Sequence, residues 1–181
     1  MFKIKLLQPD LVLGDTVLDL TQEILDQYEI KGLILDVDET LVPLTKSFVS
    51  EELRHWIDNI KAKTPIWLVS NNLSRNRISY IASTLKLPYL SGAGKPSRRK
   101  LRKAVSAMDL PVSQIAMVGD RLFTDVLAGN RLGMFTILVN PIQISKSHPI
   151  QDLEIWISKR LGVSLTSSKY KLVKKNKNIT D

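Results

Sequence analysis

The stretch Leu33-Ile34-Leu35-Asp36-Val37-Asp38-Glu39-Thr40-Leu41-Val42 decides the fold. It opens with an apolar run, which is typical of a strand buried on both faces of a parallel sheet. Asp36 and Asp38 follow at the carboxyl end of that strand, where open α/β sheets bind their ligands. Residues two apart in an extended chain point the same way, so both carboxylates can converge on one small volume. Their repulsion requires a cation or a proton, unless they are simply solvated acids in a turn.

Downstream of this stretch, apolar strands alternate with amphipathic helices. We expect strands at 65–69, 87–90, 115–118 and 135–139. Each is preceded by a helical pattern of apolar residues, as at Leu53, Trp56, Ile57 and Ile60. The alternation predicts an α/β fold of three layers, α/β/α, with a central parallel sheet and helices on both faces.

Several residues are expected to mark where helices begin. Ser50, Ser74 and Thr124 suit the N-cap position, and Pro96 suits the first turn of the helix that carries Leu101. Before the opening strand we expect an extended segment at 10–17 and a helix with Leu20, Ile24 and Leu25 on one face. A last helix carries Leu153, Trp156, Ile157 and Leu161. These elements predict one domain over 1–165, followed by a basic tail over 166–181.

Length and composition exclude several classes of protein. The chain has 181 residues and 44% hydrophobic content, which suffices for one domain with its own core. It has no cysteine, so disulfides and thiolate nucleophiles are excluded, and a reducing cytoplasmic location fits. The first residues are too short an apolar stretch for a signal peptide. No run approaches the roughly 18 apolar residues of a membrane span, so any membrane contact is expected to be peripheral.

The net charge of +8 is concentrated in two places. One cluster comprises Lys95, Arg98, Arg99, Lys100, Arg102 and Lys103, and the tail adds Lys169, Lys171, Lys174, Lys175 and Lys177. Such patches suit nucleic acid, acidic lipid headgroups or phosphorylated substrates, although they can also be solvated surfaces. With 6% aromatic residues, the chain lacks the stacking platforms of a single-strand binder, so nucleic acid is the least favoured partner.

Polar residues recur where the expected strands end. Ser70 and Asn71 follow the second strand, Lys95 precedes a helix, and Asp120 and Asp125 follow the strand at 115–118. Because parallel strands end at one edge of the sheet, we expect these residues to meet Asp36 and Asp38 there.

This set of side chains suits phosphoryl transfer. The oxygens of Asp36, Asp120 and Asp125 match a hard cation such as Mg²⁺. A lysine and a serine hydroxyl can hold phosphate oxygens. One aspartate can form an aspartyl-phosphate, while a second protonates the leaving oxygen and then activates water.

Four motifs in order resemble the haloacid dehalogenase (HAD) superfamily. They are Asp36-Val37-Asp38-Glu39-Thr40-Leu41, Ser70, Lys95-Pro96 and Gly119-Asp120-Arg121-x-x-Thr124-Asp125. The resemblance implies a Rossmann-like fold with Asp36 as nucleophile and Asp38 as general acid/base, and this second aspartate favours phosphatases over dehalogenases. It further implies that Ser70 and Lys95 hold the phosphoryl group, assisted by Thr40 and Asn71. The implied Mg²⁺ site comprises Asp36, Asp38 through its backbone carbonyl, and Asp120, with Asp125 supporting the metal site or pairing with Lys95.

The intervals between the motifs predict an open site. The segments from Asp38 to Ser70 and from Ser70 to Lys95 are each filled by a loop, a helix and a strand. No room remains for an inserted cap domain. An uncapped site favours a phosphate presented by a protein, a nucleic acid end or a lipid headgroup at a membrane.

A narrower resemblance is to the YqeG and phosphatidylglycerophosphate phosphatase family. It rests on the segment 118–133 and on the lead from Pro9 to Gly32. This likeness implies removal of the terminal phosphate of phosphatidylglycerophosphate. The charge pattern is compatible with that substrate, and it predicts that Arg98, Arg99, Arg102 and the lysine-rich tail contact the inner face of an anionic membrane. Glu39 departs from the asparagine common in the family, and strand alternation predicts that it points away from the two aspartates. The alternatives are a HAD phosphatase acting on a phosphoprotein, nucleotide or sugar phosphate, and a basic nucleic-acid or ribosome-associated binding module.

Overall fold

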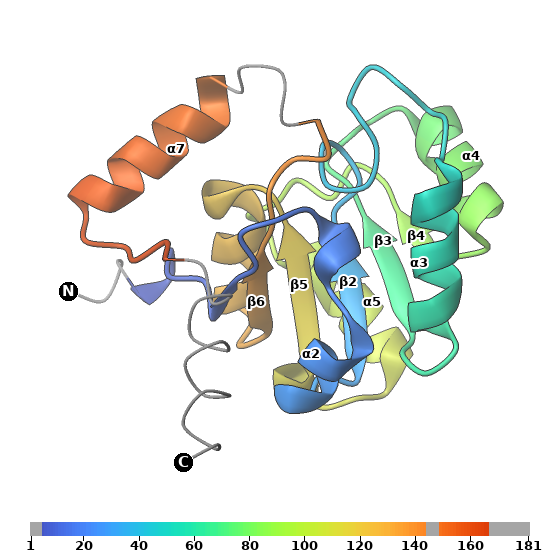
Figure 1. The fold of residues 1–181 in the computed structure, drawn as a ribbon, viewed down its shortest axis with the longest axis horizontal. Coiled ribbons are helices and arrows are strands. Elements are labelled where there is room, and N and C mark those ends of the chain that lie inside the picture. Colours follow the sequence, from blue (N-terminus) through green and yellow to red (C-terminus); the bar gives the residue numbers. More distant parts are fainter. Residues whose placement is uncertain (1–4, 144–148, 167–181) are drawn as a thin grey trace, which may run out of the picture.

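A six-stranded parallel sheet organises the computed structural model, which describes residues 5–143 and 149–166 (Figure 1). Its strands are β1 (Leu11–Val12), β2 (Gly32–Leu35), β3 (Ile66–Val69), β4 (Tyr89–Leu90), β5 (Ile115–Gly119) and β6 (Phe135–Leu138). Their order is β1-β6-β5-β2-β3-β4, and every neighbouring pair is parallel. The chain passes from β2 to β3 on one side, and later returns to β5 on the other. The strand β2 therefore lies at the switch point of the topology, where such sheets bind ligands.

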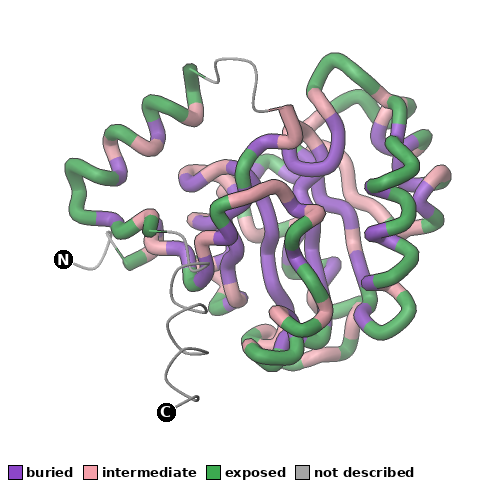
Figure 2. Tube along the Cα trace, viewed as in Figure 1, coloured by how far each residue is buried: buried purple, intermediate pink, exposed green. Residues whose placement is uncertain are grey.

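Helices cover both faces of the sheet and complete the three layers that the sequence predicts (Figure 2). They are α2 (Gln22–Gln27), α3 (Glu51–Lys61), α4 (Arg75–Leu85), α5 (Arg99–Met108), α6 (Leu127–Asn130) and α7 (Pro149–Arg160), with short turns η1 (Val17–Asp19), η2 (Val112–Gln114) and η3 (Leu122–Val126). Leu33 and Leu35 pack in one core with α2, α3 and α4, while Ile34 packs in a second with α5 and α6. The apolar run of β2 therefore serves both faces, as expected for a central strand.

The helix starts agree only in part with the sequence. Ser50 caps α3, where its Oγ accepts the backbone N–H of Leu53 at 3.2 Å. Ser74 precedes α4 but makes no side-chain cap bond. The predictions for Thr124 and Pro96 were wrong: Thr124 lies inside the π-helical turn η3, and α5 begins only at Arg99.

The N-terminal lead contributes an edge strand to the sheet. Within the extended segment predicted at 10–17, β1 pairs with β6. The carboxylate of Asp10 accepts both the backbone N–H and the hydroxyl of Thr136, at 2.8 and 2.9 Å. This side-chain pairing ties the lead to the sheet, a contact that periodicity alone does not predict.

The last helix, α7, faces the opposite way from its sequence pattern. Its polar residues Glu154 and Ser158 are buried, while Leu153 and Trp156 are exposed, as is Leu161 just after the helix. The other amphipathic helices, such as α3, bury their apolar stripe. The helix itself was predicted, but its packing follows polar contacts described below.

No domain is inserted within residues 5–143, since α3 alone lies between β2 and β3, and α4 alone lies between β3 and β4. This confirms the prediction that the fold has no large cap domain. Among the helices of the described residues, none combines the length and apolar character needed to span a bilayer. The lysines predicted to form a basic tail lie outside the described residues.

Candidate active site

The opening stretch turns sharply once it leaves β2. The backbone N–H of Asp36 still donates to the carbonyl of Val118 on β5, at 2.9 Å. Glu39 then adopts a φ of 62°, and its N–H donates to the carbonyl of Val42 at 2.8 Å. This turn breaks the strand alternation, so the expectation that Glu39 points away was wrong: it lines the same cavity as Asp36 and Asp38.

Three buried carboxylates converge around one buried lysine. Asp36, Asp120 and Asp125 each offer an oxygen within 4.8 Å of the others. Lys95 Nζ lies 2.5 Å from Asp36 Oδ1, 2.7 Å from Asp125 Oδ1 and 2.9 Å from the carbonyl of Val69. Asp125 Oδ1 is paired with Lys95 by charge but accepts no hydrogen bond of good geometry. With every group ionised, three carboxylates and one ammonium leave a net charge of 2− in this cluster.

Thr40 and Gly119 bring the carboxylates close together. The buried hydroxyl of Thr40 donates to Asp120 Oδ1 at 3.2 Å and lies 3.5 Å from Asp36 Oδ2. Gly119 ends β5, and a Cβ there would lie only 2.3 Å from Asp125 Oδ2. A side chain at 119 would therefore displace Asp125 from the cluster.

The electrostatics of the cluster reflect its burial. Burial and the neighbouring Asp125 raise the pKa of Asp36 to about 7, against the opposing attraction of Lys95. Burial, followed by repulsion from Asp125 and Asp36, raises the pKa of Asp120 to about 8. Burial alone would lower the pKa of Lys95, but the two adjacent carboxylates, Asp125 and Asp36, hold it above its ordinary value. The lysine is therefore charged, and the neighbouring acids repel one another.

Asp38 is held apart from this cluster by donors from other elements. Its Oδ2 accepts the hydroxyl of Ser70 at 2.8 Å, and its Oδ1 lies 2.5 Å from Arg77 Nη1. The guanidinium of Arg77 also donates to the carbonyls of Pro43 and Lys46, at 2.9 and 2.8 Å. Arg77 thus joins Asp38 to the loop after β2. Sequence reasoning missed it, because nothing in the helical pattern of α4 distinguishes this arginine from a solvated one.

Asn71 fixes the backbone of Lys95 with both ends of its amide. Its Oδ1 accepts the N–H of Lys95 at 2.7 Å, and its Nδ2 donates to the carbonyl of Lys95 at 3.0 Å. Asn71 and Lys95 both line the cavity that contains the carboxylates. The structure therefore brings together all the predicted residues, with Ser70 and Thr40 buried behind the cavity wall.

The loop after β5 is fastened by α7. Gln151 Nε2 donates to the carbonyl of Asp120 at 2.8 Å. Glu154 pairs with the guanidinium of Arg121 and accepts the backbone N–H of Leu122 at 3.1 Å. Sequence reasoning missed these contacts too, since a glutamate within an apolar helix gives no sign of its partner.

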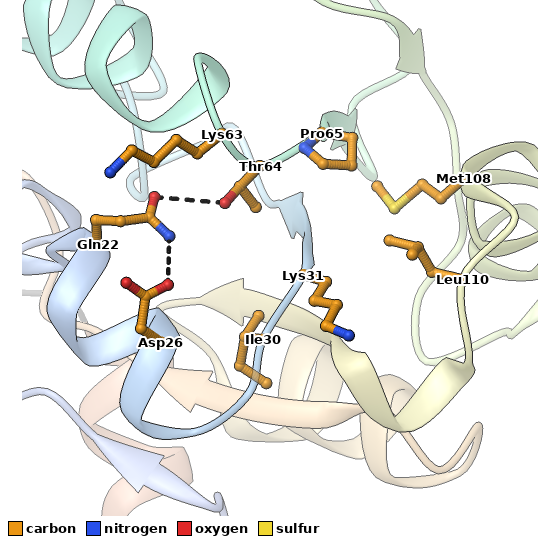
Figure 3. A pocket seen from close by; sticks show the side chains of 9 residues that line it. All are labelled: Gln22, Asp26, Ile30, Lys31, Lys63, Thr64, Pro65, Met108 and Leu110. Atoms are coloured by element: carbon orange, nitrogen blue, oxygen red, sulfur yellow. Dashed lines mark hydrogen bonds between the residues drawn. The ribbon is translucent and has the colours of Figure 1, made fainter.

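Two hollows meet at this edge of the sheet. The cavity with the carboxylates has a volume of about 150 Å³. A second hollow of about 220 Å³ shares Glu39, Leu44, Asp120 and Arg121 with the first, and extends it toward Ile150 on α7. A larger hollow of about 400 Å³ lies at the opposite edge, between the end of α2, Lys31 and Thr64 (Figure 3). There Gln22 bonds to Asp26 and Thr64, and no cluster of carboxylates faces the hollow (Figure 3).

The residues present fit a divalent cation. Their donors are carboxylate oxygens, which Mg²⁺ prefers, and the net charge of 2− equals the charge that one such ion would neutralise. Burial and mutual repulsion raise the pKa values of Asp36 and Asp120, as expected where carboxylates gather in one buried site.

Known proteins resemble this chain in sequence and in fold. A family model described as HAD-hydrolase-like matches residues 92–141. The chain is 35% identical over 130 residues to the probable phosphatase YqeG of Bacillus subtilis (strain 168), a match that covers 71% of this chain and 75% of that protein. It is 26% identical over 151 residues to the chloroplastic/mitochondrial phosphatidylglycerophosphate phosphatase 1 of Arabidopsis thaliana, with 76% of this chain and 43% of that protein covered. The chain thus spans less than half the length of the plant protein.

A solved structure shows the same fold at low identity. It is a putative 3-deoxy-D-manno-octulosonate 8-phosphate phosphatase from Vibrio cholerae, with a TM-score of 0.52 and 14% sequence identity. The match covers 74% of this chain and 76% of that one. At this identity the likeness concerns the fold alone.

Proposed function

Since this chain belongs to the HAD superfamily of phosphatases, within the family of YqeG, we propose that it hydrolyses a phosphate monoester through an aspartyl-phosphate on Asp36. The observation that carries the proposal is the buried cluster of Asp36, Lys95, Asp120 and Asp125, with its net charge of 2−. Burying three carboxylates around one lysine costs stability unless a cation compensates their charge. A purely structural role gives no reason for such an arrangement at the edge where α/β sheets bind ligands.

Two steps, each balanced in atoms and protons, describe the reaction. In the first, the carboxylate of Asp36 attacks phosphorus, the P–O bond to the leaving group breaks, and a protonated Asp38 gives its proton to the departing oxygen. In the second, Asp38 takes a proton from water as that water attacks phosphorus. The bond between phosphorus and Asp36 then breaks, which restores the carboxylate and releases inorganic phosphate.

The neighbouring residues hold and orient these groups. Ser70 and Arg77 direct the carboxylate of Asp38 from behind. Lys95 supplies positive charge beside Asp36 for the phosphoryl oxygens, and Asn71 fixes the backbone at Lys95. Asp36, Asp120 and Asp125, with the backbone carbonyl of Asp38, would hold Mg²⁺. When bound, this ion would neutralise charge on the carboxylates and on the phosphoryl oxygens.

For the substrate, we propose the terminal phosphate of phosphatidylglycerophosphate or a closely related anionic lipid. The name of the plant relative supports this choice, together with a site that no inserted domain covers. Arg99 and Arg102, both exposed on α5, and Arg98 just before it are suited to face an anionic surface, which attracts basic residues.

A substrate panel tests both the proposed reaction and the proposed substrate. Purified full-length protein with Mg²⁺ should release phosphate from p-nitrophenyl phosphate, and at a higher kcat/KM from phosphatidylglycerophosphate in mixed micelles. Asp36→Asn should abolish turnover of both, because the amide cannot attack phosphorus. If this variant retained turnover, Asp36 would not be the nucleophile. Good rates on soluble esters without release from the lipid would instead favour a nucleotide, sugar phosphate or phosphoprotein.

A further inference from the structure

Most of the large exposed apolar side chains among the described residues lie on or beside α7, or on the loops that follow β2 and β3. Seven of the eight lie on α7, directly after it, or on the loops after β2 and β3: Leu44, Phe48, Leu73, Ile150, Leu153, Trp156 and Leu161. The eighth, Tyr80, lies on α4, on the far side of the sheet from α7 (Figure 1). Scattered single residues would need no explanation, but a grouped set marks an interaction surface.

The helix α7 provides three of these side chains. Ile150, Leu153 and Trp156 are 61%, 56% and 56% exposed, and their spacing places them along one side of the helix. Most of α7 is accordingly coloured exposed or intermediate in Figure 2. The opposite side carries Gln151 and Glu154, which bind the loop after β5. The helix is thus fastened by its polar side and presents its apolar side outward.

This outward side has the chemistry of a membrane-interface helix. Its tryptophan has an amphipathic ring of the kind that gathers at the boundary between lipid and water. The guanidinium carbon of Arg160 lies 4.9 Å from the centre of the Trp156 ring, and Lys159 precedes it. An apolar stripe with basic residues beside it binds in the plane of an anionic bilayer.

The surface continues into the candidate active site. Ile150 lines the hollow that also contains Leu44 and Asp120, and this hollow adjoins the cavity with the carboxylates. A helix lying in the headgroup region would therefore place the mouth of the site at the height of the phosphates.

We propose that the outward face of α7, with Leu44 at the mouth of the site, docks on an anionic phospholipid bilayer. The proposal rests on the proposed function, because it gives the phosphatase access to a headgroup without extracting the lipid. It assigns the docking chiefly to apolar insertion of α7, in addition to the attraction of Arg98, Arg99 and Arg102.

The test compares vesicle binding of full-length variants. Vesicles contain neutral and anionic phospholipid in equal amounts, and binding is measured by co-sedimentation. Leu153→Gln/Trp156→Gln preserves helix propensity but removes the apolar stripe, so we expect affinity to fall at least about tenfold. Tyr80→Gln changes an equally exposed aromatic residue on α4 and should leave affinity unchanged. Turnover of p-nitrophenyl phosphate should be unchanged in both variants, because none of the three substituted positions lines the site.

Fluorescence identifies the inserting residue. Brominated lipid should quench tryptophan emission in the wild type, and Trp156→Phe should retain binding within about threefold while losing the quenching. Unchanged binding by Leu153→Gln/Trp156→Gln, or persistent quenching in Trp156→Phe, would overturn the proposal. The proposal would also be overturned if Leu153→Gln/Trp156→Gln changed the protein from dimer to monomer without loss of vesicle binding. In that case a second copy of the chain would cover the outward face of α7. Failure of the proposed function would appear separately, as vesicle binding without turnover of any phosphate ester.

Discussion

Replacing Lys95 by Met tests the charge balance of the buried cluster. Methionine keeps much of the apolar stem but removes the ammonium that lies 2.5 Å from Asp36 and 2.7 Å from Asp125. The cluster would then carry three carboxylates and no cation. Removing one partner of a buried ion pair costs about 3–5 kcal/mol, so we expect the free energy of unfolding to fall by about that amount near pH 8 in metal-free buffer.

The loss should depend on pH in a defined direction. Burial raises the pKa of Asp36 to about 7 and that of Asp120 to about 8, above the value of an unfolded aspartate. A group with a higher pKa in the folded state binds protons more tightly there, so it stabilises the fold at low pH. This stabilisation disappears as pH rises through the folded pKa. Because Lys95 lowers the pKa of Asp36, that pKa should rise further without the lysine, and the destabilisation should grow as the pH rises above about 7.

A double variant separates charge from packing. Lys95→Met/Asp125→Asn leaves two carboxylates and restores the net charge of 2− found in the wild type. We therefore expect it to recover at least about 2 kcal/mol relative to the sum of the two single variants. Urea unfolding followed by circular dichroism measures all four proteins. A loss below about 1 kcal/mol in Lys95→Met, or strict additivity of the two changes, would refute the charge-balance reasoning.

Three further predictions follow from the same contacts. In Gly119→Ala, the new Cβ would collide with Asp125. The kcat/KM for a soluble ester should therefore fall at least about 100-fold, and Mg²⁺ should no longer raise the Tm of the variant. An unchanged rise in Tm would contradict the reasoning. In Arg77→Met, kcat should fall about 10–100-fold, and the amide hydrogens of the 43–46 loop should exchange faster. The same substitution in an Asp38→Asn background should lower the rate little further. If the two losses instead multiplied, Arg77 would not act through Asp38. Because Mg²⁺ requires ionised carboxylates, the rise in Tm that it produces should be larger at about pH 8.5 than at about pH 6, and an equal rise would exclude Asp36 and Asp120 as ligands.

The sheet and the convergence of the site residues could be predicted because both follow from strand patterns. An apolar run in a parallel sheet fixes β2, and chain direction then sets where Asp36 and Asp38 lie. The same reasoning applies to Ser70 after β3 and to Asp120 after β5, since all these strands end at one edge. This reasoning requires only the order of strands and loops along the chain, which local sequence patterns indicate.

The contacts that were missed depend on long-range pairing of polar side chains. Arg77 meets Asp38 across the loop after β2, and Glu154 meets Arg121 from a different helix. No local pattern reveals such partners. The prediction for Thr124 failed because η3 forms a π-helical turn that begins earlier, a choice that cap propensity does not determine. Glu39 was misplaced because a positive φ cancels the alternation on which the prediction relied.

The orientation of α7 shows why hydrophobic periodicity alone cannot position every helix. Two apolar stripes of similar spacing, on α3 and α7, face the core in one case and solvent in the other. The difference is that α7 carries Gln151 and Glu154 on its other side, where the loop holding Asp120 offers a carbonyl, a guanidinium and free backbone N–H groups. If the helix turned over, the buried carboxylate of Glu154 would lose its partners, and that cost can outweigh the exposure of a few apolar residues. Fastening the loop of the acidic cluster and presenting an apolar surface beside the site are therefore two consequences of one packing choice.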